Sequence, residues 1–160
     1  MHELKLDRWQ RHDWQLRHQN VTVLHSEPFR WSWFATTLVT YVFVIHETPD
    51  SYASLMNDYT SLRDFARNHK QTRLPFSLQS GLAILPIYIG DDFDADLIKH
   101  VESTYRKRWC VIHIPSLYDR QTNAFYTLDD NYLWGGAYRD FVSAAIHRVA
   151  LQLKPPLTIA

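Results

Sequence analysis

Residues 84–101 decide how the rest of this chain is interpreted, and they read Ile-Leu-Pro-Ile-Tyr-Ile-Gly-Asp-Asp-Phe-Asp-Ala-Asp-Leu-Ile-Lys-His-Val. An apolar run ends at Gly90, an acidic turn follows, and apolar residues then recur every three or four positions. This succession predicts a buried strand, a turn and an amphipathic helix. The carboxyl end of a strand is the usual ligand site in open α/β sheets, but a helix start also attracts Asp for structural reasons.

Pro86 stands in the middle of the strand expected over residues 83–89. Proline has no backbone N–H, so it cannot donate to a sheet ladder, and it is normally confined to edges and bulges. The sequence therefore predicts that this segment is an edge strand, a bulged strand or two short pieces.

The segments on either side extend the α/β pattern. We expect helices over residues 3–19, 50–69 and 138–153 and strands over 21–25, 34–46, 109–114 and 124–128, with Asp50 as the N-cap of the second helix and Gly135-Gly136 preceding the last. Together with the opening strand and helix, the element order is α-β-β-α-β-α-β-β-α. This order predicts an α/β fold of two or three layers, with a mixed sheet of about five strands in a single globular domain over residues 1–160.

The composition excludes several classes of protein. Apolar residues at 46% and aromatic residues at 14% supply a substantial core. Lys plus Arg (17) balances Asp plus Glu (17), so the chain has no general attraction for nucleic acid or anionic membrane. Cys110 is the only cysteine, which excludes an intrachain disulfide, and we expect it to be a small core residue. The first residues lack the apolar run of a secretion signal, and residues 33–45 are too short to span a bilayer. We therefore expect a soluble cytoplasmic protein.

The acidic turn resembles the opening of a calcium loop but fails its later positions. Counted from Asp92, the sixth and twelfth positions hold Leu97 and Ser103, where an EF-hand needs Gly and Glu. If the helix begins near Phe93, Asp94 and Asp96 lie roughly 200° apart around it, because each residue advances ~100°. This spacing favours helix capping over a shared metal ion.

A stronger functional hypothesis comes from three strand ends taken together. If the strands ending near residues 45, 89 and 114 are parallel, their carboxyl ends meet at one edge of the sheet. Mixed His and carboxylate side chains at such an edge suit Mg²⁺, Mn²⁺ or Zn²⁺, which can activate water. The catalytic candidates are His46, Asp91, Asp92, His113 and Asp119, and the metal-ligand candidates among them are His46, Asp91 and Asp92.

Other catalytic patterns are excluded more directly. Cys110 and His113 lie three residues apart on one expected strand, so they face opposite sides and cannot form a local dyad. The chain has no G-x-S-x-G, P-loop or dinucleotide-binding motif. The clustered aromatic residues are a separate signal that fits either a core or an exposed interface. They are Trp9, Trp14, Phe29, Trp31, Trp33 and Phe34.

Two hypotheses follow. The first is a non-catalytic protein-interaction or regulatory module that binds a protein partner or a second copy of itself as a homodimer, without a cofactor. The alternative is a metal-dependent hydrolase or nuclease that uses the carboxyl ends of the strands and a divalent metal. The balanced charges argue against a nucleic acid partner, and we expect no membrane partner.

Overall fold

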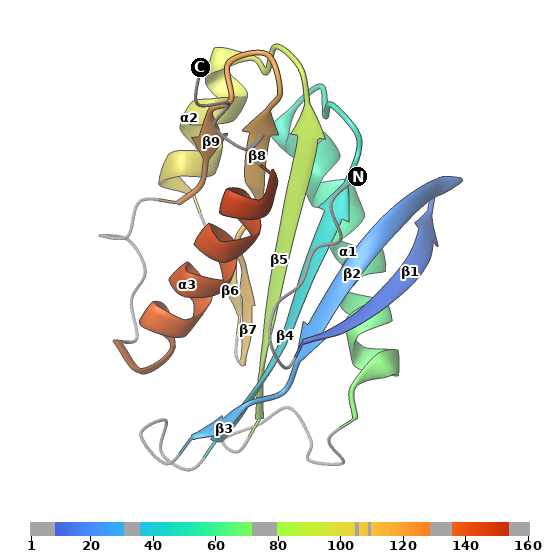
Figure 1. Ribbon diagram of the computed structural model, residues 1–160, viewed down its shortest axis with the longest axis vertical. Coiled ribbons are helices and arrows are strands. Elements are labelled where there is room, and N and C mark those ends of the chain that lie inside the picture. Colours follow the sequence, from blue (N-terminus) through green and yellow to red (C-terminus); the bar gives the residue numbers. More distant parts are fainter. Residues whose placement is uncertain are drawn as a thin grey trace, which may run out of the picture.

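The computed structural model of this chain describes residues 9–30, 36–71, 80–104, 106–108, 110–128 and 136–153. Within them, one mixed sheet of nine strands, two of them only two residues long, is covered by three helices (Figure 1). The expected α/β class is confirmed, with more strands than expected. The elements are β1 (Gln10–Leu16), β2 (Gln19–Ser26), β3 (Phe29–Arg30), β4 (Thr36–Ile45), α1 (Tyr52–His69), β5 (Ser80–Gly90), α2 (Ala95–Ser103), β6 (Arg106–Arg108), β7 (Val111–His113), β8 (Ser116–Asp119), β9 (Phe125–Tyr126) and α3 (Gly136–Leu153).

The sheet has a parallel centre and antiparallel margins. β4 runs parallel to β5, and β5 runs parallel to both β7 and β8 on its other side. β1 and β2 extend the sheet beyond β4 as an antiparallel hairpin, while β6 and β9 pair antiparallel with β7 and β8. The resulting order, β1-β2-β4-β5-β7-β6, places the carboxyl ends of β4, β5 and β8 at one end of the sheet.

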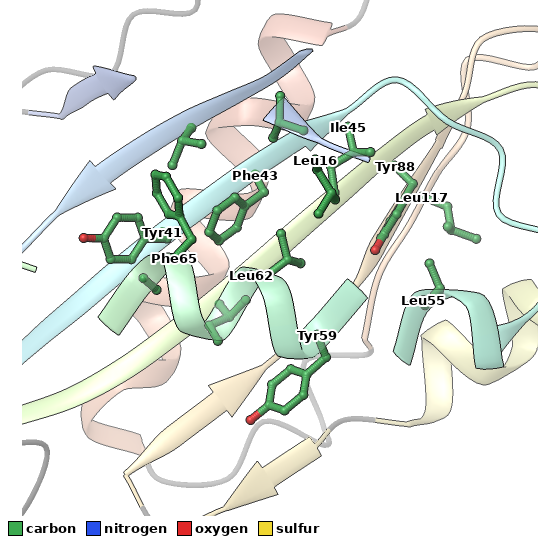
Figure 2. Close-up of a cluster of buried hydrophobic side chains, with 14 of the residues drawn as sticks. Leu16, Tyr41, Phe43, Ile45, Leu55, Tyr59, Leu62, Phe65, Tyr88 and Leu117 are labelled. Carbon is green, nitrogen blue, oxygen red and sulfur yellow. The ribbon is translucent and has the colours of Figure 1, made fainter. Parts of the chain in front are cut away.

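The helices form two layers around this sheet. The apolar sides of α1 and α2 pack on one face, and α3 packs on the other (Figure 1). Residues of β4 alternate between the layers, with Tyr41 and Phe43 facing α1 and Val42 facing α3. Figure 2 shows Leu62 and Phe65 of α1 lying over the aromatic residues of β4. This strand is buried on both faces, as its β-branched and aromatic sequence predicts.

The helix expected over residues 3–19 is wrong over its described part, since residues 10–16 form β1; residues 3–8 lie outside the described residues. Trp14 and Leu16 point into the core on the α1 side, and their spacing of two residues is that of a strand. Arg17 (φ 48°) and His18 (φ 73°) then form a two-residue turn of left-handed conformation. Such a turn matches the twist of the strands on either side, and it fixes the β1–β2 hairpin.

The prediction that β5 is an edge strand is wrong as well. β5 is fully flanked, and Pro86 pairs with Phe43 of β4 on one side. On the other side, β5 pairs first with β7, where Ile84 faces His113, and then with β8, where Ile87 faces Ser116. Both pairings have the same register, so Pro86 faces Pro115, the residue just before β8. The strand opposite Pro86 is therefore itself interrupted, between β7 and β8.

Backbone hydrogen bonds explain why proline is tolerated at this central position. The carbonyl of Ile84 accepts from the Ile114 N–H at 3.1 Å, and the carbonyl of Gly90 accepts from the Arg120 N–H at 3.0 Å. Alternate residues of a strand turn their backbone groups to the same neighbour, so position 86 also faces this side. Pro86, which has no N–H to donate, therefore lies opposite the break between β7 and β8, where the ladder of backbone hydrogen bonds is already interrupted.

The two helix starts next to the sheet's carboxyl end differ slightly from expectation. α1 is capped by Ser51 rather than Asp50, and the Ser51 hydroxyl accepts the Ser54 N–H at 3.3 Å. α2 is capped by Asp94, whose carboxylate accepts the N–H groups of Asp96 and Leu97. The capping interpretation of this part of the acidic turn is therefore confirmed.

Candidate functional site

The carboxyl ends of the parallel strands bring some of the expected site residues together. His46 follows β4, Asp91 follows β5, and Arg120 follows β8. The Asp91 carboxylate is held by both sides of the Arg120 guanidinium, with the Arg120 Nε donating to Asp91 Oδ1 at 2.9 Å and a second bond joining Arg120 Nη2 to Asp91 Oδ2. His46 is exposed, but desolvation by the loops around it, and then the charge of Arg120, lower the pKa of its ring.

Gly90 allows the loop after β4 to cross the end of β5. A Cβ at position 90 would lie 3.0 Å from the Cβ of Thr48 and 3.0 Å from the ring of Phe93, and it would collide with the Thr48 hydroxyl. With glycine there, the Thr48 hydroxyl accepts the Asp91 N–H at 3.3 Å. The loops after β4 and β5 are thus held together by direct contacts.

The remaining candidates have other surroundings. The Asp119 carboxylate accepts the N–H groups of Gln121 (2.8 Å) and Thr122 (3.3 Å), closing the turn between β8 and β9. Burial acts to raise the pKa of Asp119, but the hydrogen bonds from these two residues outweigh it and lower the pKa. Asp92 is exposed with a left-handed backbone (φ 54°). His113 lies inside the protein, where its ring packs edge-on against Tyr59 with centroids 4.8 Å apart.

These surroundings give the metal hypothesis little support. The described residues contain no group of three or more His, Cys, Asp or Glu side chains that could hold a metal ion. Both oxygens of Asp91 already accept from Arg120, and Asp119 is occupied by its own turn. The metal-dependent hydrolase stays a prediction, and it requires a metal ion to displace the hydrogen bonds that now engage Asp91 and Asp119.

A second polar cluster, which the sequence interpretation missed, lies under the same end of the sheet. Asp58 of α1 has a side chain only 3% exposed, yet it forms an ion pair with Arg17 of the hairpin turn. Tyr88 of β5 donates its hydroxyl to Asp58 Oδ2 at 3.1 Å. Burial, followed by the adjacent Asp58 carboxylate, raises the pKa of Tyr88 well above its usual value. The phenol is therefore a donor that remains protonated, and the cluster fastens the hairpin to α1.

The spacing of the helix contains the signal for this cluster. Asp58 comes three residues after Leu55 and four before Leu62, and both of these leucines are fully buried. Residues with that spacing share one face of a helix, so an Asp between them is expected to be buried and to need a partner. The sequence does not show which partner, because Arg17 lies 41 residues away.

A third polar cluster lies near the other end of β2. The His25 ring is buried, stacks on Tyr41 with centroids 4.4 Å apart, and has its Nε2 2.9 Å from Glu27 Oε1. The same Glu27 oxygen accepts the backbone N–H of Gln71 at 2.6 Å. Burial lowers the pKa of His25 even though Glu27 acts to raise it. This cluster connects β2 to the end of α1.

The most exposed regular element in this region is β1. Five of its seven residues are exposed, Trp14 is half-buried and Leu16 is buried. Among the described strands β1 pairs only with β2, so it forms one margin of the sheet. Exposed Arg11 and Asp13 lie on the same face of β1, with Arg11 Nη2 3.6 Å from Asp13 Oδ1.

Trp9 and Trp14, the two tryptophans described near the chain's start, are partly buried and pack against the core. Trp14 packs against Phe65 with centroids 4.6 Å apart, and Trp9 stacks on Phe141 of α3 at 6.1 Å. Trp31, Trp33 and Phe34 lie outside the described residues. Cys110, expected in the core, is half-buried with a left-handed backbone (φ 60°) just before β7.

No protein-family model, curated protein sequence or solved structure matches this chain. Within the described part of the chain, no helix is long and apolar enough to cross a membrane.

Proposed function

We propose that this chain is a non-catalytic protein-interaction module and that β1 is its binding element. The observation that carries the proposal is the position of β1, a seven-residue strand at the margin of the sheet with five exposed residues. A strand of this kind presents backbone donors and acceptors along its outer side. A segment of another chain can pair with them by strand addition.

The hairpin turn determines which backbone groups of β1 face outward. In a two-residue turn of left-handed residues, the carbonyl of Leu16 points to Gln19 of β2. Because the direction alternates along an antiparallel strand, residues 14, 12 and 10 also face β2. The N–H and C=O groups of Arg11, Asp13 and Gln15 then face away from β2 and are placed to receive a strand.

The other margin of the sheet offers much less. β6 is three residues long and reads Arg-Lys-Arg, and short, positively charged strands are typical of edges that resist pairing. β1 is longer and carries both signs of charge, at Arg11 and Asp13. The contrast supports β1 as the element that a partner would contact.

β1 is also firmly held, which favours binding. Trp14 packs against both Phe43 and Phe65, and the Arg17–Asp58 pair fixes the end of the hairpin to α1. A binding element that is already ordered loses little conformational freedom when it is bound. At the sheet's carboxyl end, by contrast, Asp91 is engaged by Arg120 and Asp119 by the backbone of its own turn, which favours a role without catalysis.

Photo-crosslinking tests this proposal directly. A photoreactive residue at position 15 of β1 should give a protein adduct in cells, whereas the same residue at Glu102, exposed on α2, should not. Asp13→Pro should abolish the adduct, because it removes an outward N–H and leaves the β1–β2 ladder intact. The melting temperature and circular dichroism of this variant check that it folds. No adduct at position 15, or an adduct that Asp13→Pro leaves unchanged, would overturn the proposal.

A further inference from the structure

We infer that the partner of β1 is a second copy of this chain, paired antiparallel about a two-fold axis that passes between the two His12 residues. This inference rests on the proposed function and names its partner. A two-fold contact is self-complementary, so the same strand must present groups that match themselves when reversed. The sequence Gln-Arg-His-Asp-Trp-Gln-Leu of β1 meets that requirement at one register.

The charges select this register. When two copies of β1 are paired antiparallel about His12, Arg11 of each copy lies opposite Asp13 of the other. Directly opposed side chains of an antiparallel pair project on the same face, so both contacts join opposite charges. If the axis passes through Asp13, two Asp13 side chains oppose each other, and if it passes through Arg11, two Arg11 side chains do.

The backbone is compatible with this register and excludes others. Arg11 and Asp13 both turn their N–H and C=O groups away from β2, so opposing them creates hydrogen-bonded pairs on each side of the axis. An axis between two consecutive residues would set an outward-facing residue against an inward-facing one, and the ladder could not form. Axes at Gln10 or Trp14 keep the backbone pattern but lose the match between Arg11 and Asp13. His12 is thus the centre that satisfies both backbone and charge.

The side chains needed for these contacts are exposed in the single chain. The Asp13 side chain is 75% exposed and that of Arg11 is 37% exposed, and they already lie within 3.6 Å of each other. Their face of β1 is opposite the one that carries Trp14 and Leu16 into the core. In the pair of copies, two Arg11 and two Asp13 side chains would alternate in sign around the axis.

A charge-exchange experiment tests the register. In Arg11→Asp both opposed positions are acidic, and in Asp13→Arg both are basic. Each variant alone should weaken self-association about 30-fold, measured by sedimentation equilibrium, because two attractive cross-strand pairs become repulsive. An equimolar mixture of the two variants should restore association, since the two acidic side chains of one variant then oppose the two basic side chains of the other. Arg63→Asp, on α1, is the matched control and should associate like the wild type.

The mixture separates contact between copies from effects within one chain. A loss of stability caused by the Arg11–Asp13 contact inside the chain would persist in the mixture, and melting temperatures of the separate variants would reveal it. Wild type that remains monomeric at millimolar concentration, or a mixture that associates no better than its components, overturns the inference. If position 15 then crosslinks to a foreign protein, the proposed function survives without the second copy. If it gives no adduct, both fail.

Discussion

Two Asp–Arg pairs at the same end of the sheet show how burial changes the role of an identical interaction. Asp58–Arg17 fastens the β1–β2 hairpin to α1, and the Asp58 side chain is only 3% exposed. Asp91–Arg120 joins the loop after β5 to the turn after β8, with side chains 40% and 54% exposed. Water can replace either partner of the second pair but cannot reach the carboxylate of the first. Loss of the buried Asp58 carboxylate should therefore cost more stability than loss of either partner of the exposed pair.

The sharpest way to break this comparison is Asp58→Ala. The substitution leaves the buried Tyr88 hydroxyl without its acceptor, while the half-exposed Arg17 can be hydrated, so we expect it to lower the free energy of unfolding by about 1–3 kcal/mol in urea denaturation. Asp64→Ala, on the exposed side of the same helix, is the matched control and should cost about 1 kcal/mol or less. Equal losses for the two variants would show that burial of Asp58 contributes nothing to its role.

His25–Glu27 extends the comparison to a buried pair whose cation can lose its proton. Burial lowers the pKa of His25 below its ordinary value of 6.5. Below that pH the unfolded chain binds the proton more readily than the folded chain, so stability falls as the pH falls through and below about 6.5. Urea denaturation at pH 7.5 and 5.5 should show a smaller loss for His25→Phe, which keeps a ring on Tyr41. His147→Gln, on the exposed side of α3, should lose as much as the wild type, and a His25→Phe loss of that size would contradict the prediction.

The smallest effect is expected at the exposed pair. Asp91→Asn should change the free energy of unfolding by about 0–1 kcal/mol, with the difference shrinking at high salt. The same variant tests the hydrolase hypothesis. Asp91 is already engaged by Arg120. We therefore expect that Mg²⁺, Mn²⁺ and Zn²⁺ do not change the melting temperature of either the wild type or the variant. A metal-induced rise in the wild type that Asp91→Asn abolishes would support the hydrolase against the interaction module.

Elements with a strong local pattern could be predicted from the sequence. The β-branched and aromatic run of β4, the stripe of α1 and the capping of α2 by its acidic turn each follow from a few neighbouring residues, and the structure confirms them. The sequence favours a helix over β1 because four apolar residues before β2, Leu4, Leu6, Trp9 and Leu16, recur at roughly helical spacing. The strand spacing of Trp14 and Leu16 becomes decisive only when β2 and α1 are present to bury them.

Features that depend on two distant segments could not be predicted. Pro86 indicates an edge if β5 is considered alone, and its central position makes sense only because Pro115 interrupts the neighbouring line at the same level. Sequence reasoning placed His46 and Asp91 at the correct end of the sheet but did not find Arg120, which engages Asp91. The partner of a charged side chain is fixed by tertiary structure, and local spacing carries no record of it.

The tight crossing at Gly90 has a consequence for how this sequence can vary. A side chain at position 90 would meet both the hydroxyl and the Cβ of Thr48, so neither position can change size freely. In any set of related sequences, a residue larger than glycine at 90 should occur together with glycine at 48, and Thr at 48 should occur with glycine at 90. The two positions would then be inherited as a pair, 42 residues apart along the chain. Such linked variation would reveal, from sequences alone, that the loops after β4 and β5 cross at this point.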